Sequence, residues 1–211
     1  AGEETEINGQ GPVITEEAQQ ALFEQLDALK KEDILVLAGS IPNTLPSDIY
    51  ERILEHLQGR GIHFVVDATK ELLLKVLKYH PFLIKPNNHE LGEMFGVTLK
   101  TRDEIVTYAK KLQEMGAENV LVSMAGDGAI LLTEDGIIYK AKPPKGKVLN
   151  SVGAGDSMVA GFLTGYLNTG EYEKAFRLGV VTGSATAFQY WLATKEDIVA
   201  LMEDKPETYG L

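Results

Sequence analysis

The chain has 211 residues, of which 44% are hydrophobic and 24% are charged, a composition typical of a globular domain with one substantial core. Acidic residues outnumber basic ones by 31 to 20, and the net charge of -11 argues against binding of nucleic acid or anionic membranes through the overall field. The chain has no cysteine, which excludes disulfides and thiolate chemistry and agrees with a cytoplasmic protein.

Helix and strand patterns alternate through the first half of the chain. Thr15 can cap a first helix and Ser47 a second one. The first helix has an expected apolar face of Ala18, Leu22, Leu26 and Leu29. Short apolar runs, typical of buried parallel strands, and one further helical pattern follow. The strands are expected over residues 33–39, 62–69 and 81–87, and the third helix over residues 71–77.

The second half continues this alternation and then changes. Residues 101–104 form a capping box before a helix that ends near Met115, and residues 119–126 are expected to form a strand. Two apolar runs on either side of a Glu-Asp-Gly turn predict an antiparallel hairpin over residues 128–133 and 137–142. Three helices are expected to complete the chain, over residues 156–168, 171–190 and 195–203.

This order of elements predicts the architecture. We expect a single α/β domain over residues 1–211, with a mainly parallel sheet, right-handed connections and helices on both faces. Ligands of such sheets bind beyond the carboxyl ends of the strands. The loops after residues 38, 67, 85, 124 and 149 are therefore the places to look for function.

The most informative of these loops is LNSVGAGDS, residues 149–157. Gly153 and Gly155 leave backbone N–H groups unobstructed, and the helix that follows directs its positive end to the same space. This arrangement suits a transferred phosphoryl group, and Asp156 could accept a proton from an attacking hydroxyl. Asp156 could equally be a simple helix cap behind a tight turn. The loop alone does not decide between the two.

The loop KPNNHE, residues 85–90, also has two interpretations. Asn87 and Glu90 are three residues apart, so they project from one face and could bind Mg²⁺ together with water and phosphates, while Lys85 could meet a nucleotide phosphate. The alternative, which is favoured when the loop is taken alone, is a helix start with Asn87 as its cap and Glu90 in its first turn.

Two further loops are less specific. Gly39 and Ser40 offer amides and a hydroxyl at a strand end, which suits a sugar phosphate, but turn formers are common there. Ser123, Gly126 and Gly128 could line a nucleotide or simply begin the hairpin. The sequence lacks a GxxxxGK[ST] loop, a GxGxxG turn in a first βαβ unit and a GxSxG elbow with a histidine partner. P-loop NTPases, nicotinamide dehydrogenases and α/β-hydrolases are therefore disfavoured.

Taken together, three motifs resemble the ribokinase-like (PfkB) family of carbohydrate kinases, and in particular its phosphosugar branch. They are NSVGAGDSMVAGFL (150–163), KPNNHE (85–90) and GSIP (39–42). The similarity covers essentially the whole chain. Residues 5–12 are most similar to the members that phosphorylate fructose 1-phosphate. The resemblance implies a Rossmann-like three-layer fold and ATP-dependent phosphorylation of a sugar phosphate, with tagatose 6-phosphate and fructose 6-phosphate as alternative substrates.

The resemblance also implies roles for individual residues. Asp156 would activate the sugar hydroxyl, and the amides of Gly153, Ala154 and Gly155 would hold the γ-phosphoryl group. Asn87 and Glu90 would organise Mg²⁺. ATP would be contacted by Lys85, Ser123, Gly126 and Gly128, and residues 179–187 would help to wall the adenine. Ser40 and Gly39 would contact the sugar phosphate. A homodimer is expected for the intact protein, with no nucleic-acid or membrane partner.

Two departures from the family pattern bear on these expectations. Asn150 and Ser151 stand where the general signature has Asp-Thr, a variant that points to the phosphosugar branch. Family members also have an amino-terminal part, about a third of the full chain, with the first strands, a β-sheet lid and most sugar contacts. We expect this part to be absent here. An ATP-binding module that is inactive as this fragment, and an α/β domain whose glycine turns are only turns, therefore remain as alternatives.

Overall fold

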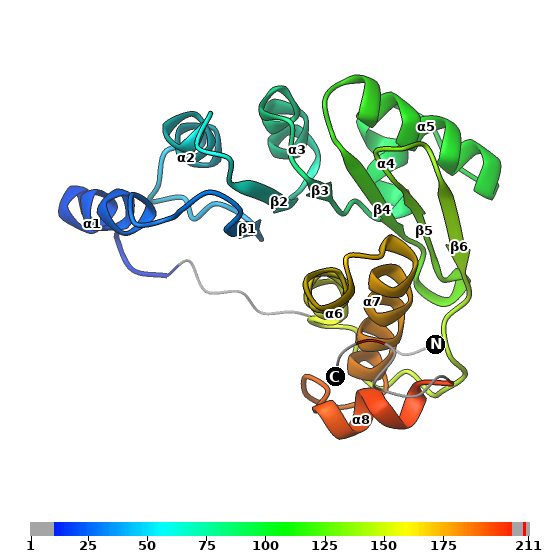
Figure 1. Cartoon of the computed structure of the whole chain (residues 1–211). Helices are drawn as coiled ribbons and strands as arrows, with labels where there is room; N and C mark the ends of the chain where they lie inside the picture. Colours follow the sequence, from blue (N-terminus) through cyan, green and yellow to red (C-terminus); the bar gives the residue numbers. More distant parts are fainter. Residues whose placement is uncertain (1–10, 204–208, 210–211) are drawn as a thin grey trace.

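The computed structural model describes residues 11–203 and Tyr209, so residues 5–10 of the stretch compared above lie outside the described part. Its centre is a sheet with the order β1-β2-β3-β4-β5-β6 (Figure 1). Strands β1 to β4 are parallel to one another, whereas β5 is antiparallel to both β4 and β6. This confirms both the mainly parallel sheet and the hairpin. The strands are β1 (Ile34–Ala38), β2 (His63–Asp67), β3 (Leu83–Ile84), β4 (Asn119–Ser123), β5 (Ala129–Leu132) and β6 (Ile138–Ala141).

Helices cover both faces of the sheet, with α1 to α5 on one side and α6 and α7 on the other (Figure 1). None of the helices in the described ranges is long and apolar enough to cross a bilayer. The helices are α1 (Glu16–Leu26), α2 (Ile49–Leu57), α3 (Lys70–Val76), α4 (Asn88–Met94), α5 (Arg102–Glu114), α6 (Ala154–Thr169), α7 (Tyr172–Ala187) and α8 (Lys195–Leu201), with short 3₁₀ turns η1 (Leu77–Tyr79) and η2 (Ala125–Asp127).

The sheet separates two apolar cores, because successive side chains of a strand point to opposite faces. In β2, Val66 faces the core beneath α1 to α5, while its neighbour Val65 faces α6 and α7. In β4, Val120 and Val122 face the first core and Leu121 the second. All five side chains are fully buried. The three-layer α/β fold is therefore confirmed in the described residues.

The outer end of the sheet is less buried than its sequence predicts. We expected residues 33–39 to form a buried strand, but in β1 only Leu37 is buried and Val36 is 42% exposed. The reason is that β1 is an edge strand of this sheet. Helix α1 lies at the same end (Figure 1), and of its expected apolar face Leu26 is buried whereas Leu22 is 38% exposed.

Several element boundaries also differ from the prediction. The cap of α2 is Asp48, without a side-chain hydrogen bond to the helix, so the prediction of Ser47 was wrong. Strand β3 is much shorter than expected and ends before Pro86, which has no N–H to donate. Strand β4 ends at Ser123, because η2 begins two residues later. Helix α7 ends at Ala187, before residue 190. Thr15 and Thr101 do cap α1 and α5, as predicted.

Helices α6 and α7 are the most closely packed pair, and glycines make this possible. A Cβ added at Gly161 of α6 would lie 2.5 Å from Thr182 Oγ1, and one added at Gly183 of α7 would lie 2.9 Å from the Ala154 carbonyl oxygen. Real Cβ atoms essentially never lie within 3.0 Å of another heavy atom, so both helices depend on glycine here. This packing fixes the position of the first turn of α6, where the candidate site lies.

Candidate functional site

The carboxyl ends of β2, β3 and β4 lie side by side, as their parallel pairing requires. Asp67 is the last residue of β2, Lys85 follows β3 directly, and Ser123 is the last residue of β4. The Ser123 N–H donates to the Pro86 carbonyl at 3.2 Å, and Asn87 forms a parallel bridge with Ser123. The structure thus brings Lys85, Asn87 and Ser123 to one edge of the sheet.

The glycine loop before α6 closes onto this edge. Gly153 is the N-cap of α6 and has φ +77°, in the left-handed region that favours glycine. Gly155 is the second residue of the helix, and a Cβ at this position would lie 3.1 Å from Lys85 Nζ. The ammonium of Lys85 therefore lies directly against the first turn of α6. A helix N-terminus and a cation together favour an anionic group at this place.

Asp156 is the third residue of α6, and the N-cap of that helix is Gly153. The interpretation of Asp156 as the helix cap is therefore wrong. Its side chain is exposed, and within residues 11–203 its carboxylate has no hydrogen bond or ion pair. An exposed, unpaired carboxylate beside the glycine turn has the properties that a proton acceptor needs.

The centre of the site is an ion pair that sequence reasoning missed. Lys85 Nζ lies 3.1 Å from Asp67 Oδ1, and the two side chains are only 8% and 17% exposed. Burial raises the pKa of Asp67 above its ordinary value against the opposing effect of Lys85, and the charges of Asp156 and Glu90 act in the same direction as burial. Three carboxylates therefore influence one another around a single ammonium group. The only signal for Asp67 was its place at the end of a buried strand.

The Asn87 and Glu90 side chains form a reciprocal capping box at the start of α4. Asn87 Oδ1 accepts from the Glu90 N–H, and Glu90 Oε2 accepts from the Asn87 N–H, both at 2.8 Å. The capping interpretation is thus correct, but it leaves Glu90 Oε1 available. The described residues contain no group of three or more His, Cys, Asp or Glu side chains that could hold a metal. A site with so few protein oxygen donors fits Mg²⁺, because this ion keeps several water ligands and also binds substrate phosphates.

The two glycines of the loop after β4 are in different situations. Gly128 has φ +92°, and a Cβ there would lie 2.0 Å from the Ala141 carbonyl oxygen, so the hairpin itself requires this glycine. Gly126 is exposed, and a Cβ there would meet no atom within 4 Å. The nucleotide contacts expected of Ser123, Gly126 and Gly128 stay predictions.

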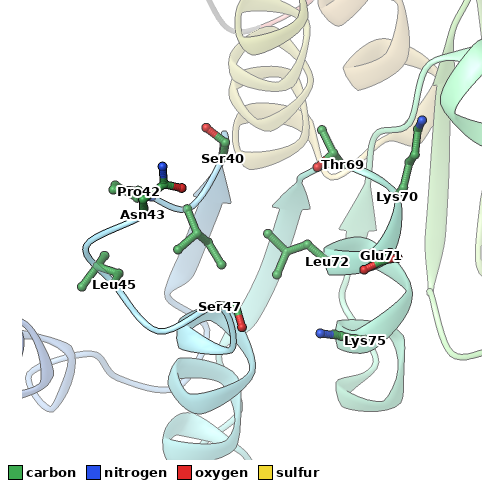
Figure 2. Close-up of a pocket in the computed structure, with 11 residues that line it drawn as sticks. Ser40, Pro42, Asn43, Leu45, Ser47, Thr69, Lys70, Glu71, Leu72 and Lys75 are labelled. Atoms are coloured by element: carbon green, nitrogen blue, oxygen red, sulfur yellow. The ribbon is translucent and has the colours of Figure 1, made fainter. Parts of the chain in front are cut away.

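A hollow of about 620 Å³ lies between the loop after β1 and the start of α3. Figure 2 shows Ser40 at its upper rim, with Leu72 and Lys75 pointing from α3 toward that loop. Lys70 also lines the hollow, although it forms a 2.5 Å ion pair with Glu93. Serine and lysine side chains around a hollow at the carboxyl ends of β1 and β2 suit an anionic sugar derivative.

The loop after β1 is attached to the same edge of the sheet. The Gly39 N–H donates to the Asp67 carbonyl at 2.9 Å, which connects this loop to the strand that carries the ion pair. A second hollow, of about 870 Å³, lies between β6, α7 and α8, and Val180 and Val181 line it. These two valines belong to the segment expected to wall the adenine, and that role stays a prediction.

A comparison with protein families decides which family these motifs represent. The model of the pfkB family of carbohydrate kinases matches residues 1–197. The chain belongs to this pfkB family. The resemblance inferred from the three motifs is thereby confirmed.

Relatives of this pfkB family chain include a 1-phosphofructokinase of Bacillus subtilis (strain 168), 54% identical over 203 residues, which make up 96% of this chain and 67% of the relative. A D-tagatose-1-phosphate kinase of Bacillus licheniformis is 35% identical over 186 residues, covering 88% of this chain and 61% of that protein. The crystal structure of a candidate phosphofructokinase from Staphylococcus aureus superposes with a TM-score of 0.87 at 44% identity, covering 95% and 65% of the two chains. The pfkB family chain thus spans about two thirds of the length of these relatives.

Proposed function

We propose that the protein transfers the γ-phosphoryl group of ATP to a hydroxyl of a sugar phosphate, with fructose 1-phosphate as substrate and fructose 1,6-bisphosphate as product. The observation that carries this proposal is the placement of Lys85 Nζ, 3.1 Å from the Cβ position of Gly155, against the same first turn of α6 that contains Asp156, whose carboxylate has no partner within residues 11–203. Membership of the carbohydrate kinase family and the 1-phosphofructokinase relative support the choice of reaction and substrate.

In the proposed reaction, the γ-phosphoryl group lies at the first turn of α6. The amides of Gly153, Ala154 and Gly155 donate to its oxygens, and the Lys85 ammonium offsets its negative charge. The sugar hydroxyl oxygen forms a bond to the γ-phosphorus while the bond from that phosphorus to the β–γ bridging oxygen breaks. Asp156 accepts the hydroxyl proton, and ADP leaves.

Glu90, through the carboxylate oxygen outside the capping box, and Asn87 would hold Mg²⁺, directly or through water. The metal would supply charge neutralisation for the nucleotide phosphates. On the nucleotide side, Ser123, Gly126 and Gly128 would line the bound ATP. On the sugar side, Ser40 and Gly39 would contact the substrate phosphate at the rim of the first hollow. The whole protein is proposed to act in the cytoplasm as a homodimer.

The relative named D-tagatose-1-phosphate kinase favours a second sugar substrate. A coupled assay of ADP release tests both, with fructose 1-phosphate, fructose 6-phosphate, tagatose 1-phosphate and tagatose 6-phosphate on the longest natural protein that contains this sequence. We expect the highest kcat/KM for fructose 1-phosphate. A higher kcat/KM for another of these sugar phosphates would change the proposed substrate but not the proposed reaction. Binding of Mg-ATP without ADP release for any of the four would favour an inactive nucleotide-binding module instead.

A further inference from the structure

Asp67 has no role in the reaction described so far, yet it lies at the centre of the site. Its backbone is held by the end of β1, because it pairs with Ala38 and its carbonyl accepts from the Gly39 N–H at 2.9 Å. The side chain extends from the end of β2 toward the start of the segment after β3, where it meets Lys85. The carboxylate is therefore a fixed point, since a strand and not a loop carries it.

Lys85 depends on this fixed point for its position. Its side chain has four rotatable bonds, and ordering such a chain costs rotamer entropy that a specific partner must offset. Within residues 11–203, Asp67 is the ion-pair and hydrogen-bond partner of Lys85 Nζ, and no second one is found. An ammonium has three N–H donors. One can donate to Asp67 Oδ1 at 3.1 Å, which leaves two for an acceptor beside Gly155, whose Cβ position is 3.1 Å from Nζ.

A purely structural role does not account for this pair. A buried ion pair contributes little net stability, because the loss of hydration offsets most of the attraction between the charges. Asp67 is in addition surrounded by unfavourable influences, since burial and the charges of Asp156 and Glu90 all oppose its ionisation. Carboxyl groups whose pKa is shifted by burial and by specific neighbouring charges are concentrated at functional sites.

We propose that Asp67 is a positioning residue whose carboxylate holds the Lys85 ammonium against the first turn of α6, so that its free N–H donors face the transferred phosphoryl group. This inference rests on the proposed function, in which Lys85 contacts that group. Asp67 itself touches neither ATP nor the sugar. Loss of the Asp67 carboxylate therefore acts through Lys85. The Lys85 side chain takes up other rotamers, and the transferred phosphoryl group loses one aligned N–H donor.

The test is a double-mutant cycle on the longest natural protein that contains this sequence, with Asp67→Asn, Lys85→Met and the combination of both. Asp67→Asn keeps the shape and one acceptor oxygen but removes the charge. Because misplacement of a group by about 1 Å can cost on the order of 100-fold in rate, we expect kcat to fall by roughly 10-fold to 100-fold with little change in the KM for the sugar phosphate. In the Lys85→Met background, Asp67→Asn is expected to change kcat by less than about 3-fold, because residues that act as a unit are not additive.

Two readouts separate positioning from folding. Calorimetry should show that Asp67→Asn weakens binding of ATP more than that of ADP, which lacks only the γ-phosphate. Asp67→Glu, which keeps the charge, should recover part of the lost kcat, and Asp103→Asn, which removes the exposed 3.4 Å ion pair to Lys140, should leave kcat unchanged. A kcat for Asp67→Asn within about 2-fold of wild type, or an equal loss in both backgrounds, overturns the proposal. Failure of the proposed function would look different, because the wild-type protein itself would then release no ADP.

Discussion

Gly155→Ala separates a phosphate cradle from a simple turn, because the two interpretations predict opposite relations between stability and activity. Gly155 is the second residue of α6 and does not have a positive φ. Alanine is a better helix residue than glycine by about 0.5–1 kcal/mol, so the free energy of unfolding should rise by this amount. For a chain of this size the corresponding rise in Tm is roughly 1–4 °C.

The same methyl group enters the site. Its carbon would lie 3.1 Å from Lys85 Nζ, closer than ordinary contact, so the ammonium must move by a few tenths of an ångström or more. Lys85 is tied to Asp67 and cannot simply swing away. The methyl group would also occupy space beside the amides that are proposed to hold the γ-phosphoryl group. A shift of this size should lower kcat by on the order of 10-fold to 100-fold.

The assay combines urea unfolding with coupled ADP release on the same preparations. Ala160→Gly, an exposed change in the middle of the same helix, is the matched control and should lower stability by about 0.5–1 kcal/mol without affecting kcat. A Gly155→Ala protein that is more stable than the wild type and keeps full kcat would refute the phosphate cradle, because glycine at this position would then be needed neither for folding nor for catalysis. A loss of stability would show that the 3.1 Å contact with Lys85 outweighs the helical preference for alanine.

Two further predictions concern carboxylates. Glu90→Gln can keep the 2.8 Å hydrogen bond of the capping box, so the free energy of unfolding should change by less than about 0.5 kcal/mol. Half-maximal activity should nevertheless require several-fold more Mg²⁺. An unchanged Mg²⁺ requirement would exclude Glu90 from the metal site. Burial, and secondarily the charge of Glu134, raises the pKa of Glu118. The stability it contributes is therefore full below its ordinary pKa and is lost as pH rises through the folded value. The free energy of unfolding of Glu118→Gln, measured with urea, should therefore rise relative to that of the wild type between pH 4 and pH 7. A difference in this free energy that stays constant over the range would contradict the prediction.

Local signals predicted those parts of the fold that local interactions determine. The Thr101 capping box and the hairpin of β5 and β6 both follow from the spacing of neighbouring residues. The parallel direction of β1 to β4 followed from their alternation with helices. The reciprocal capping box of Asn87 and Glu90 was also readable, as one of two interpretations of the same residues.

Features that depend on distant parts of the chain were missed. Val36 was expected to be buried, but burial of a strand depends on what packs against its far face, and β1 is at the edge. The cap position of Asp156 was a wrong interpretation because a left-handed Gly153 starts the helix earlier. Asp67 was overlooked because a single aspartate after an apolar run resembles a turn former, and its partner Lys85 comes from the next strand.

The most direct test of the central claim is the kinetics of Asp156→Asn with Mg-ATP and fructose 1-phosphate, on the longest natural protein that contains this sequence. The asparagine cannot accept the hydroxyl proton but keeps the shape of the exposed carboxylate at the first turn of α6. We predict that kcat falls by roughly 100-fold to 10,000-fold while the Kd for ATP measured by calorimetry stays the same. A near-normal kcat for Asp156→Asn would contradict the assignment of this residue as the base.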